Sequence, residues 1–96
     1  MTAQHGRGPA VAATWDFGRA CVEAAVAALA AGGTALDAVE QGAWVAEEDA
    51  ANASVGLGGN PNSQGTVQLD AAIMWGPAHA AGSVAALEGF LHPVSV

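Results

Sequence analysis

A glycine pair followed by a threonine, Gly32-Gly33-Thr34, divides the first half of the chain into two segments with helical periodicity. Before the pair, apolar residues recur at intervals of three or four, which predicts a helix over residues 17–31. These residues are Phe17, Cys21, Ala24, Ala28 and Ala31. After the pair, the same spacing predicts a second helix. Its apolar residues are Leu36, Val39, Ala43, Ala46 and Ala50.

The residues at and after the glycine pair carry the signals for ending one helix and starting the next. Glycine readily adopts the left-handed conformation that ends helices. Thr34, with Asp37 three residues later, is typical of an N-terminal capping box. We therefore expect an antiparallel pair of helices that covers a sheet. Glu40, Glu47 and Glu48 lie largely off the second apolar stripe, which predicts that they face solvent.

The stretch from Val11 to Gly18 predicts a corner between a strand and the first helix. Small apolar residues lead to Thr14 and Trp15, where we expect the strand to end. Asp16 is a favourable residue to cap a helix that opens at Phe17. Trp15 would then lie where α/β proteins tend to place ligand contacts. The local pattern alone favours the alternative, a tryptophan buried beneath the helix, because buried aromatics are the commoner case.

The second half of the chain predicts a β-hairpin. A glycine-rich loop spans residues 54–62, and residues 66–74 then alternate before becoming fully apolar, which suits a strand that enters a buried layer. Trp75-Gly76-Pro77 turns the chain, and residues 79–87 return as the partner strand. A further helix is expected to begin near Pro93. Residues 1–9 contain glycine and proline and show no periodicity, which predicts a flexible leader.

Composition limits the partners that the chain can have. Its 96 residues provide one small domain or a piece of a larger one. It has nine acidic residues, two arginines and no lysine, for a net charge of −7, so we expect no nucleic-acid partner. The single cysteine, Cys21, excludes an internal disulfide. No signal-peptide pattern and no membrane-length apolar run are visible, so we expect a cytoplasmic protein without membrane contact.

The residues alone do not assemble a catalytic or cofactor site. The glycines at 56, 58 and 59 lack the spacing of a phosphate loop, and Ser54 lacks the context of a serine nucleophile. The three histidines lack metal-ligand spacing, so neither a metal nor another cofactor is expected. Removal of Met1 would expose Thr2, whose own amine could act as its base, but its Gly-Pro surroundings offer no oxyanion donors. Asn52-Ala53-Ser54 matches a glycosylation sequon, which we attribute to coincidence.

Four motifs in one register resemble the N-terminal part of the glycosylasparaginase (aspartylglucosaminidase) family. They are Thr14-Trp15-Asp16-Phe17, residues 32–40 (GGTALDAVE), residues 54–61 (SVGLGGNP) and residues 69–74 (LDAAIM). The family belongs with the isoaspartyl peptidase/type III asparaginases, which are N-terminal nucleophile hydrolases. The resemblance implies an α/β fold, an αββα four-layer sandwich. Residues 10–96 would form an incomplete domain from its α-subunit, with two helices on a partial sheet.

The resemblance also implies the chemistry. In the family, a precursor cleaves itself and exposes a threonine, whose hydroxyl attacks the side-chain amide of an asparagine-derived substrate while its amine handles the proton. That threonine follows an aspartate, and none of the four threonines of this chain has this setting. We therefore expect no catalytic residue here. The nucleophile is expected in a C-terminal β-subunit part, and the chain alone is expected to be inactive.

Three positions take roles from the resemblance. Trp15 matches a tryptophan of the substrate pocket, which favours the pocket interpretation over burial. Ser54 matches a serine near the cleavage site, which implies a role in self-processing rather than in substrate attack. Asp70 matches a recurrent acid, for which we expect a structural hydrogen bond. Trp75 departs from the family, which has an aspartate before the glycine, so we expect a hairpin with a distorted tip.

Two alternatives to a glycosylasparaginase part stay open. The substrate could instead be an isoaspartyl peptide or asparagine, because the residues that select it lie outside this chain. The chain could also be a truncated, non-catalytic relative that acts as an interaction module. An incomplete sheet exposes an apolar face and strand edges, so we expect the chain to form oligomers.

Overall fold

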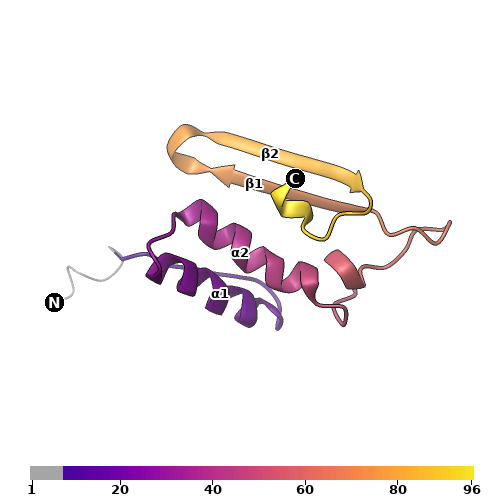
Figure 1. The fold of residues 1–96 in the computed structure, drawn as a ribbon, viewed down its shortest axis with the longest axis horizontal. Coiled ribbons are helices and arrows are strands. Elements are labelled where there is room, and N and C mark those ends of the chain that lie inside the picture. The colour runs from indigo at the N-terminus through magenta and orange to yellow at the C-terminus, as the bar shows by residue number, and fades with distance from the viewer. Residues whose placement is uncertain (1–7) are drawn as a thin grey trace.

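The computed structural model describes residues 8–96, so Thr2 and most of the leader predicted for residues 1–9 lie outside the described residues. The described chain contains two helices, two strands and three short 3₁₀ turns (Figure 1). In chain order they are α1 (Gly18–Ala30), α2 (Ala35–Glu48), η2 (Gly56–Gly58), β1 (Leu69–Trp75), η3 (Gly76–Ala78), β2 (Ala80–Leu87) and η4 (Pro93–Ser95).

Helix α2 is the middle layer of the described chain. It packs against α1 on one side, and against β1 and η4 on the other (Figure 1). The two strands pair antiparallel as a two-stranded sheet within residues 8–96. The expected fold class, an α/β fragment with two helices packed on an incomplete sheet, is therefore confirmed. Neither helix in this described part is long and apolar enough to cross a membrane.

The turn between the helices forms as the sequence predicts. The Gly33 amide donates to the Ala28 carbonyl at 2.9 Å, and Gly32 has φ of +90°, the left-handed conformation that glycine tolerates. The capping box is complete, because the Asp37 amide donates to Thr34 Oγ1 at 3.1 Å and the Thr34 amide donates to Asp37 Oδ2 at 2.8 Å. Both predicted helices are thus confirmed.

The helices meet through their smallest residues. Ala25, Ala28 and Ala38 form the buried cluster, and Val11 packs against it. The backbones approach so closely that a Cβ at Gly42 would lie 2.9 Å from the Cys21 carbonyl oxygen. The predicted stripes were therefore partly wrong. Ala31 and Val39 are exposed, because α1 and α2 contact each other at other positions, which carry only small side chains.

The strand predicted before α1 does not form in the described chain, and Asp16 does not cap the helix. Residues 9–14 have no strand pairing there and instead run beside the helices. A strand needs a neighbour for its backbone hydrogen bonds, and the hairpin contacts the opposite side of α2. Helix α1 begins at Gly18, with Phe17 as an N-cap that makes no side-chain hydrogen bond. The Gly18 amide donates to the Trp15 carbonyl at 3.1 Å instead.

The hairpin contains a β-bulge opposite Asp70. Leu69 pairs with Leu87 but Ala71 pairs with Val84, so β2 has one extra residue at this point. Asp70 Oδ1 accepts a hydrogen bond of 2.9 Å from the Ala86 amide, and Ala86 has φ of +52°. The carboxylate therefore holds the bulge in place, which is the structural role expected for Asp70.

The tip and the faces of the hairpin differ in how well they were predicted. Trp75 is the last residue of β1, pairs with Ala80 and is half-buried, and η3 with a left-handed His79 closes the turn. The expectation of a strand inside a buried layer is wrong for the described chain. Residues of β1 alternate between half-buried and exposed, because α2 and η4 cover only one of its faces.

We predict that Asp70→Ala lowers the free energy of unfolding by about 1 kcal/mol, because the Ala86 amide loses its acceptor. Ala86→Gly should raise it by a similar amount, since glycine removes the strain of a left-handed alanine. Urea denaturation followed by circular dichroism measures both changes. Glu23→Ala is the control, because it removes an exposed ion pair with Arg19 at 3.5 Å and should change stability little. An Asp70→Ala variant as stable as wild type would contradict the assignment.

Candidate functional site

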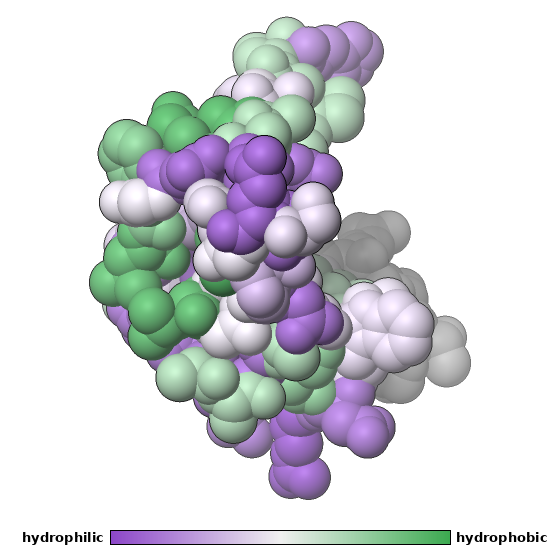
Figure 2. Space-filling model, turned by 90° about the vertical axis from the view of Figure 1, so that its right-hand side faces the viewer, coloured by the Kyte–Doolittle hydropathy of each residue, from purple (hydrophilic) through white to green (hydrophobic). Residues whose placement is uncertain are grey.

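An apolar groove of about 550 Å³ runs between the N-terminal segment and the two helices. Its walls are Val11–Thr14 and the facing sides of α1 and α2, and it reaches Phe17, Glu47 and Val55. Because the helices are antiparallel, the start of α1 and the end of α2 lie at the same end of the pair (Figure 1). Seen from that side, apolar residues gather along one flank of the molecule and hydrophilic residues cross the middle (Figure 2).

Trp15 lies at this end of the helix pair and is 78% exposed. Its backbone has φ of +66°, so the chain turns sharply before α1 begins. Thr14, just before it, and Phe17, two residues after it, line the groove, whereas Trp15 itself does not. In the described chain the indole is therefore not the buried anchor that was the alternative interpretation. Its substrate-binding role stays a prediction.

Ser54 is exposed and is positioned by its own loop. Its amide donates to Asn52 Oδ1 at 2.9 Å, and the neighbouring Ala53 carbonyl accepts from the Asn60 amide at 3.2 Å. Val55 lines the same groove as Thr14. Ser54 and Trp15 thus both border this groove through their chain neighbours. The processing role of Ser54 stays a prediction.

Two glycines allow the loop after Ser54 to pack closely against the end of α2. Gly56 has φ of +62°, and a Cβ there would collide with the Glu47 carbonyl. A Cβ at Gly58 would collide with the carbonyls of Ala50 and Asn52. These glycines therefore serve close backbone packing, which agrees with the absence of phosphate-loop spacing in the sequence.

Glu47 is a correction to the sequence analysis, which predicted a solvated face. It is only 6% exposed, because η4 packs over this part of α2. Its Oε2 accepts from the Val94 amide at 2.9 Å, while Oε1 has no partner within the described residues. Burial raises the pKa of the Glu47 carboxyl above 4.5, and the nearby Glu40 and Glu48 act in the same direction. The Val94 hydrogen bond and His92 oppose that rise.

Asn52 is a supporting residue that the sequence analysis missed. It is 8% exposed, and its side chain closes a turn onto the Ser54 amide. Its Nδ2 has no partner among residues 8–96. The sequence does carry a signal for this role, since asparagine side chains commonly accept from the backbone amide two residues later in turns.

The described residues do not form a complete catalytic set. No group of three or more metal-ligating side chains comes together in residues 8–96, and Cys21 is half-buried. His79 lies at the hairpin tip, and His92 pairs with Glu48, both away from Ser54 in the chain. The groove has an apolar wall, and the exposed Trp15 and Ser54 lie on chain segments whose neighbouring residues line it.

Comparison with known proteins assigns a family. Residues 2–96 match the sequence model of the family described as Asparaginase. The chain is 46% identical to an N(4)-(Beta-N-acetylglucosaminyl)-L-asparaginase of Elizabethkingia miricola over 92% of this chain and 26% of that protein. The mouse (Mus musculus) protein of the same name is 43% identical over 92% of this chain and 25% of that protein. A human (Homo sapiens) isoaspartyl peptidase/L-asparaginase is 43% identical over 71% of this chain and 22% of that protein.

These shares define how much of such a protein the chain represents. The chain spans about a quarter of the length of the curated relatives it matches. The match covers the groove, the Ser54 loop and the hairpin.

We predict that Gly56→Ala lowers the free energy of unfolding by more than about 3 kcal/mol, because the new methyl group must displace the Glu47 backbone. Gly65→Ala is the matched control. Gly65 also has a positive φ, of +81°, but nothing lies within 4 Å of its Cβ position. That variant should lower the free energy of unfolding by only about 1 to 2 kcal/mol, which is the cost of a left-handed conformation at alanine. Equal losses in thermal or urea denaturation would show that the close contact with α2 does not matter.

Proposed function

The chain belongs to the asparaginase family, and from this premise we propose that it is the N-terminal, α-subunit part of an amidohydrolase that cleaves the β-aspartyl amide bond of N4-(β-N-acetylglucosaminyl)-L-asparagine. The relatives with that name match a larger share of the chain than the isoaspartyl peptidase does. This difference supports glycosylated asparagine as the substrate.

The observation that carries the proposal is the exposed indole of Trp15, which lies in the chain between two residues that line an apolar groove, Thr14 and Phe17. An indole that is 78% exposed costs hydrophobic free energy in this chain, and a ligand that covers it recovers that energy. A flat aromatic ring also restricts how a substrate can lie without needing a charge. We assign Trp15 to one wall of the substrate pocket.

In this proposal the reacting atoms come from outside the chain. The hydroxyl of an N-terminal threonine attacks the amide carbon, its α-amine takes the hydroxyl proton, and that proton passes to the departing amine. Water then hydrolyses the ester and releases aspartate. The described residues hold no nucleophile with an adjacent base, which fits a part that binds substrate but is inactive alone.

Two other functions remain as alternatives. An isoaspartyl peptidase/L-asparaginase would use the same nucleophile on a different leaving group, and a human relative of that name supports this reading of the substrate. A non-catalytic interaction module is favoured by a different observation, the exposed apolar side chains of the described chain. These include Leu57, Met74, Phe90 and Leu91. Such a module would form oligomers through its uncovered sheet.

Co-expression with the missing part separates these functions. The chain would be produced together with the remaining three quarters of a glycosylasparaginase relative, and aspartate release would be measured on glycosylated asparagine, an isoaspartyl dipeptide and asparagine. We expect activity from the pair, highest on glycosylated asparagine, and none from the chain alone. Failure of every matching partner to restore hydrolysis would favour the interaction module.

We predict that Trp15→Ala in the restored enzyme raises KM about tenfold, or about 1.4 kcal/mol of binding, with little change in kcat. Because the side chain is exposed, the melting temperature should change little. Trp75→Ala is the control. Trp75 is half-buried at the end of β1, so its loss should lower the melting temperature without raising KM. A large stability loss in Trp15→Ala with unchanged KM would show that Trp15 has a structural role and does not bind substrate.

We predict that Ser54→Ala slows self-cleavage of the precursor at least about tenfold, the scale of one lost hydrogen bond in the transition state. Hydrolysis by enzyme that has already been processed should fall much less. Gel electrophoresis over time measures the first effect, and substrate kinetics measures the second. Ser63→Ala, in the exposed loop before β1, is the control and should process normally. Normal processing of Ser54→Ala would show that Ser54 has no role in self-cleavage.

A further inference from the structure

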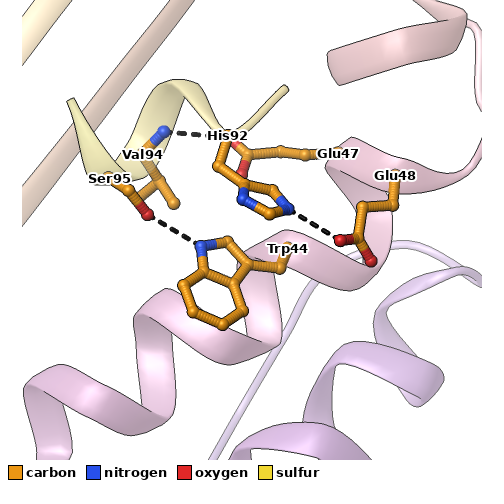
Figure 3. A network of polar contacts seen from close by, with 6 residues as sticks. All are labelled: Trp44, Glu47, Glu48, His92, Val94 and Ser95. Carbon is orange, nitrogen blue, oxygen red and sulfur yellow. Dashed lines mark hydrogen bonds and ion pairs between the residues drawn. The ribbon is translucent and has the colours of Figure 1, made fainter. Parts of the chain in front are cut away.

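Four contacts fasten the last described turn of the chain onto one face of α2 (Figure 3). The Trp44 Nε1–H donates to Ser95 Oγ at 2.7 Å, and the Val94 amide donates to Glu47 Oε2 at 2.9 Å. His92 Nε2 lies 2.8 Å from Glu48 Oε1. The His92 ring also stacks on the Trp44 ring, with centroids 4.8 Å apart and planes 21° apart.

The spacing of the α2 residues explains why one short turn engages all of them. Trp44, Glu47 and Glu48 are related by three and four positions, so they project from the same side of the helix. We call the segment His92–Ser95 the latch. It joins the hairpin side of the molecule to α2 and contributes Val94 to a hollow of about 300 Å³ between them.

The charge on His92 determines the strength of one of these contacts. A neutral imidazole can donate one ordinary hydrogen bond to Glu48, whereas an imidazolium makes a charge-assisted one. An imidazolium also gains from lying over the face of an indole. The His92 side chain is 26% exposed and that of Glu48 is 52% exposed, so solvent weakens this pairing without abolishing it.

The charged groups around His92 are acidic. From α2 these are Glu48 in contact, Glu47 beside it and Glu40 one turn or more before them. The charged residues of the hairpin side are engaged elsewhere, because Asp70 bonds Ala86 and Glu88 bonds Gln68. In the described part of the chain, no cation competes with His92 for the two glutamates, since Arg19 pairs with Glu23 on α1.

Glu47 acts in the same direction as His92 when the pH changes. Its folded pKa is raised by burial, so the stability it contributes is full at pH below its unfolded value of 4.5 and is lost as pH rises through the folded pKa. Its Oε1 has no partner in the described residues, so a proton there leaves the Val94 bond to Oε2 in place. Acidification therefore removes a buried charge while the latch keeps its backbone contact.

We propose that the latch is a pH-responsive closure, in which protonated His92, stacked on Trp44 and drawn to Glu48, holds residues 92–95 against α2 more tightly at pH 5.5 than at pH 8. Imidazole is the side chain that ordinarily changes charge across this range. The device shares only Glu47 with the groove near Trp15, and its test does not depend on the function proposed above. When it loosens, the hairpin loses one of its attachments to the helices.

The test is an NMR titration of the chain 1–96 between pH 5 and pH 8. The indole N–H of Trp44 reports closure, because it is bonded to Ser95 only when the latch is shut. After correction for the intrinsic exchange rate, its exchange with solvent should be about threefold slower at pH 5.5 than at pH 8, the scale of a partly exposed ion pair.

Two variants isolate the charge and one serves as the control. His92→Phe keeps a ring to stack on Trp44 but cannot be protonated, and Glu48→Gln keeps an acceptor but removes the negative charge. Both should remove the His92 part of the pH dependence of Trp44 exchange and leave only the part that Glu47 contributes. His79→Asn removes a histidine at the hairpin tip, at a left-handed position that asparagine tolerates, and should leave the dependence intact.

The outcomes are distinguishable. Exchange of the Trp44 N–H that is independent of pH, or fast at every pH, would overturn the proposal. So would a pH dependence in Glu48→Gln as large as that of wild type, measured on a variant whose circular dichroism matches wild type. Loss of the pH dependence in His79→Asn would show that it originates at the hairpin tip, and this result would also overturn the proposal.

Discussion

The described structure depends on close contacts between α2 and neighbouring backbone on two of its sides. On one side the helix has no side chain at Gly42, so α1 approaches until a Cβ there would lie 2.9 Å from the Cys21 carbonyl oxygen. On the other side the loop at Gly56 lies directly on the Glu47 backbone. Between these contacts the core consists of alanines, which bury little apolar area each. Close packing therefore replaces large side chains in holding this part of the chain together.

That manner of packing leaves large side chains available at the surface. Trp15, Leu57, Met74 and Phe90 are all mostly exposed in the described chain. Scattered exposed apolar residues need no explanation, but an exposed indole beside an apolar groove does. The proposal that this chain is one part of a larger amidohydrolase gives these surfaces two uses. Trp15 would meet the substrate, and the hairpin would meet the rest of the protein.

Sequence reasoning succeeded where the controlling contacts are local. The capping box joins residues three apart, and the turn at Gly32 and Gly33 depends on glycine's own conformational freedom. It failed where the deciding partner is distant. Glu47 is buried by Val94, 47 residues later, and periodicity on α2 alone could not show that both faces would be covered. The strand predicted at Val11–Thr14 failed similarly, because a strand is defined by a neighbour that the described residues do not place beside it.

The site itself was predicted unevenly for the same reason. Trp15 and Ser54 came from motifs, and in the structure their chain neighbours Thr14 and Val55 line one groove, whereas Asn52, whose side chain accepts from the Ser54 amide, became evident only in the fold. Glu47 links this site to the latch, since its backbone supports Gly56 and its carboxylate holds Val94. A substitution at Glu47 would therefore disturb the Ser54 loop and the latch together. Glu48 and His92 touch only the latch, which is why they, rather than the more deeply buried Glu47, can separate closure of the C-terminal turn from the geometry of the groove.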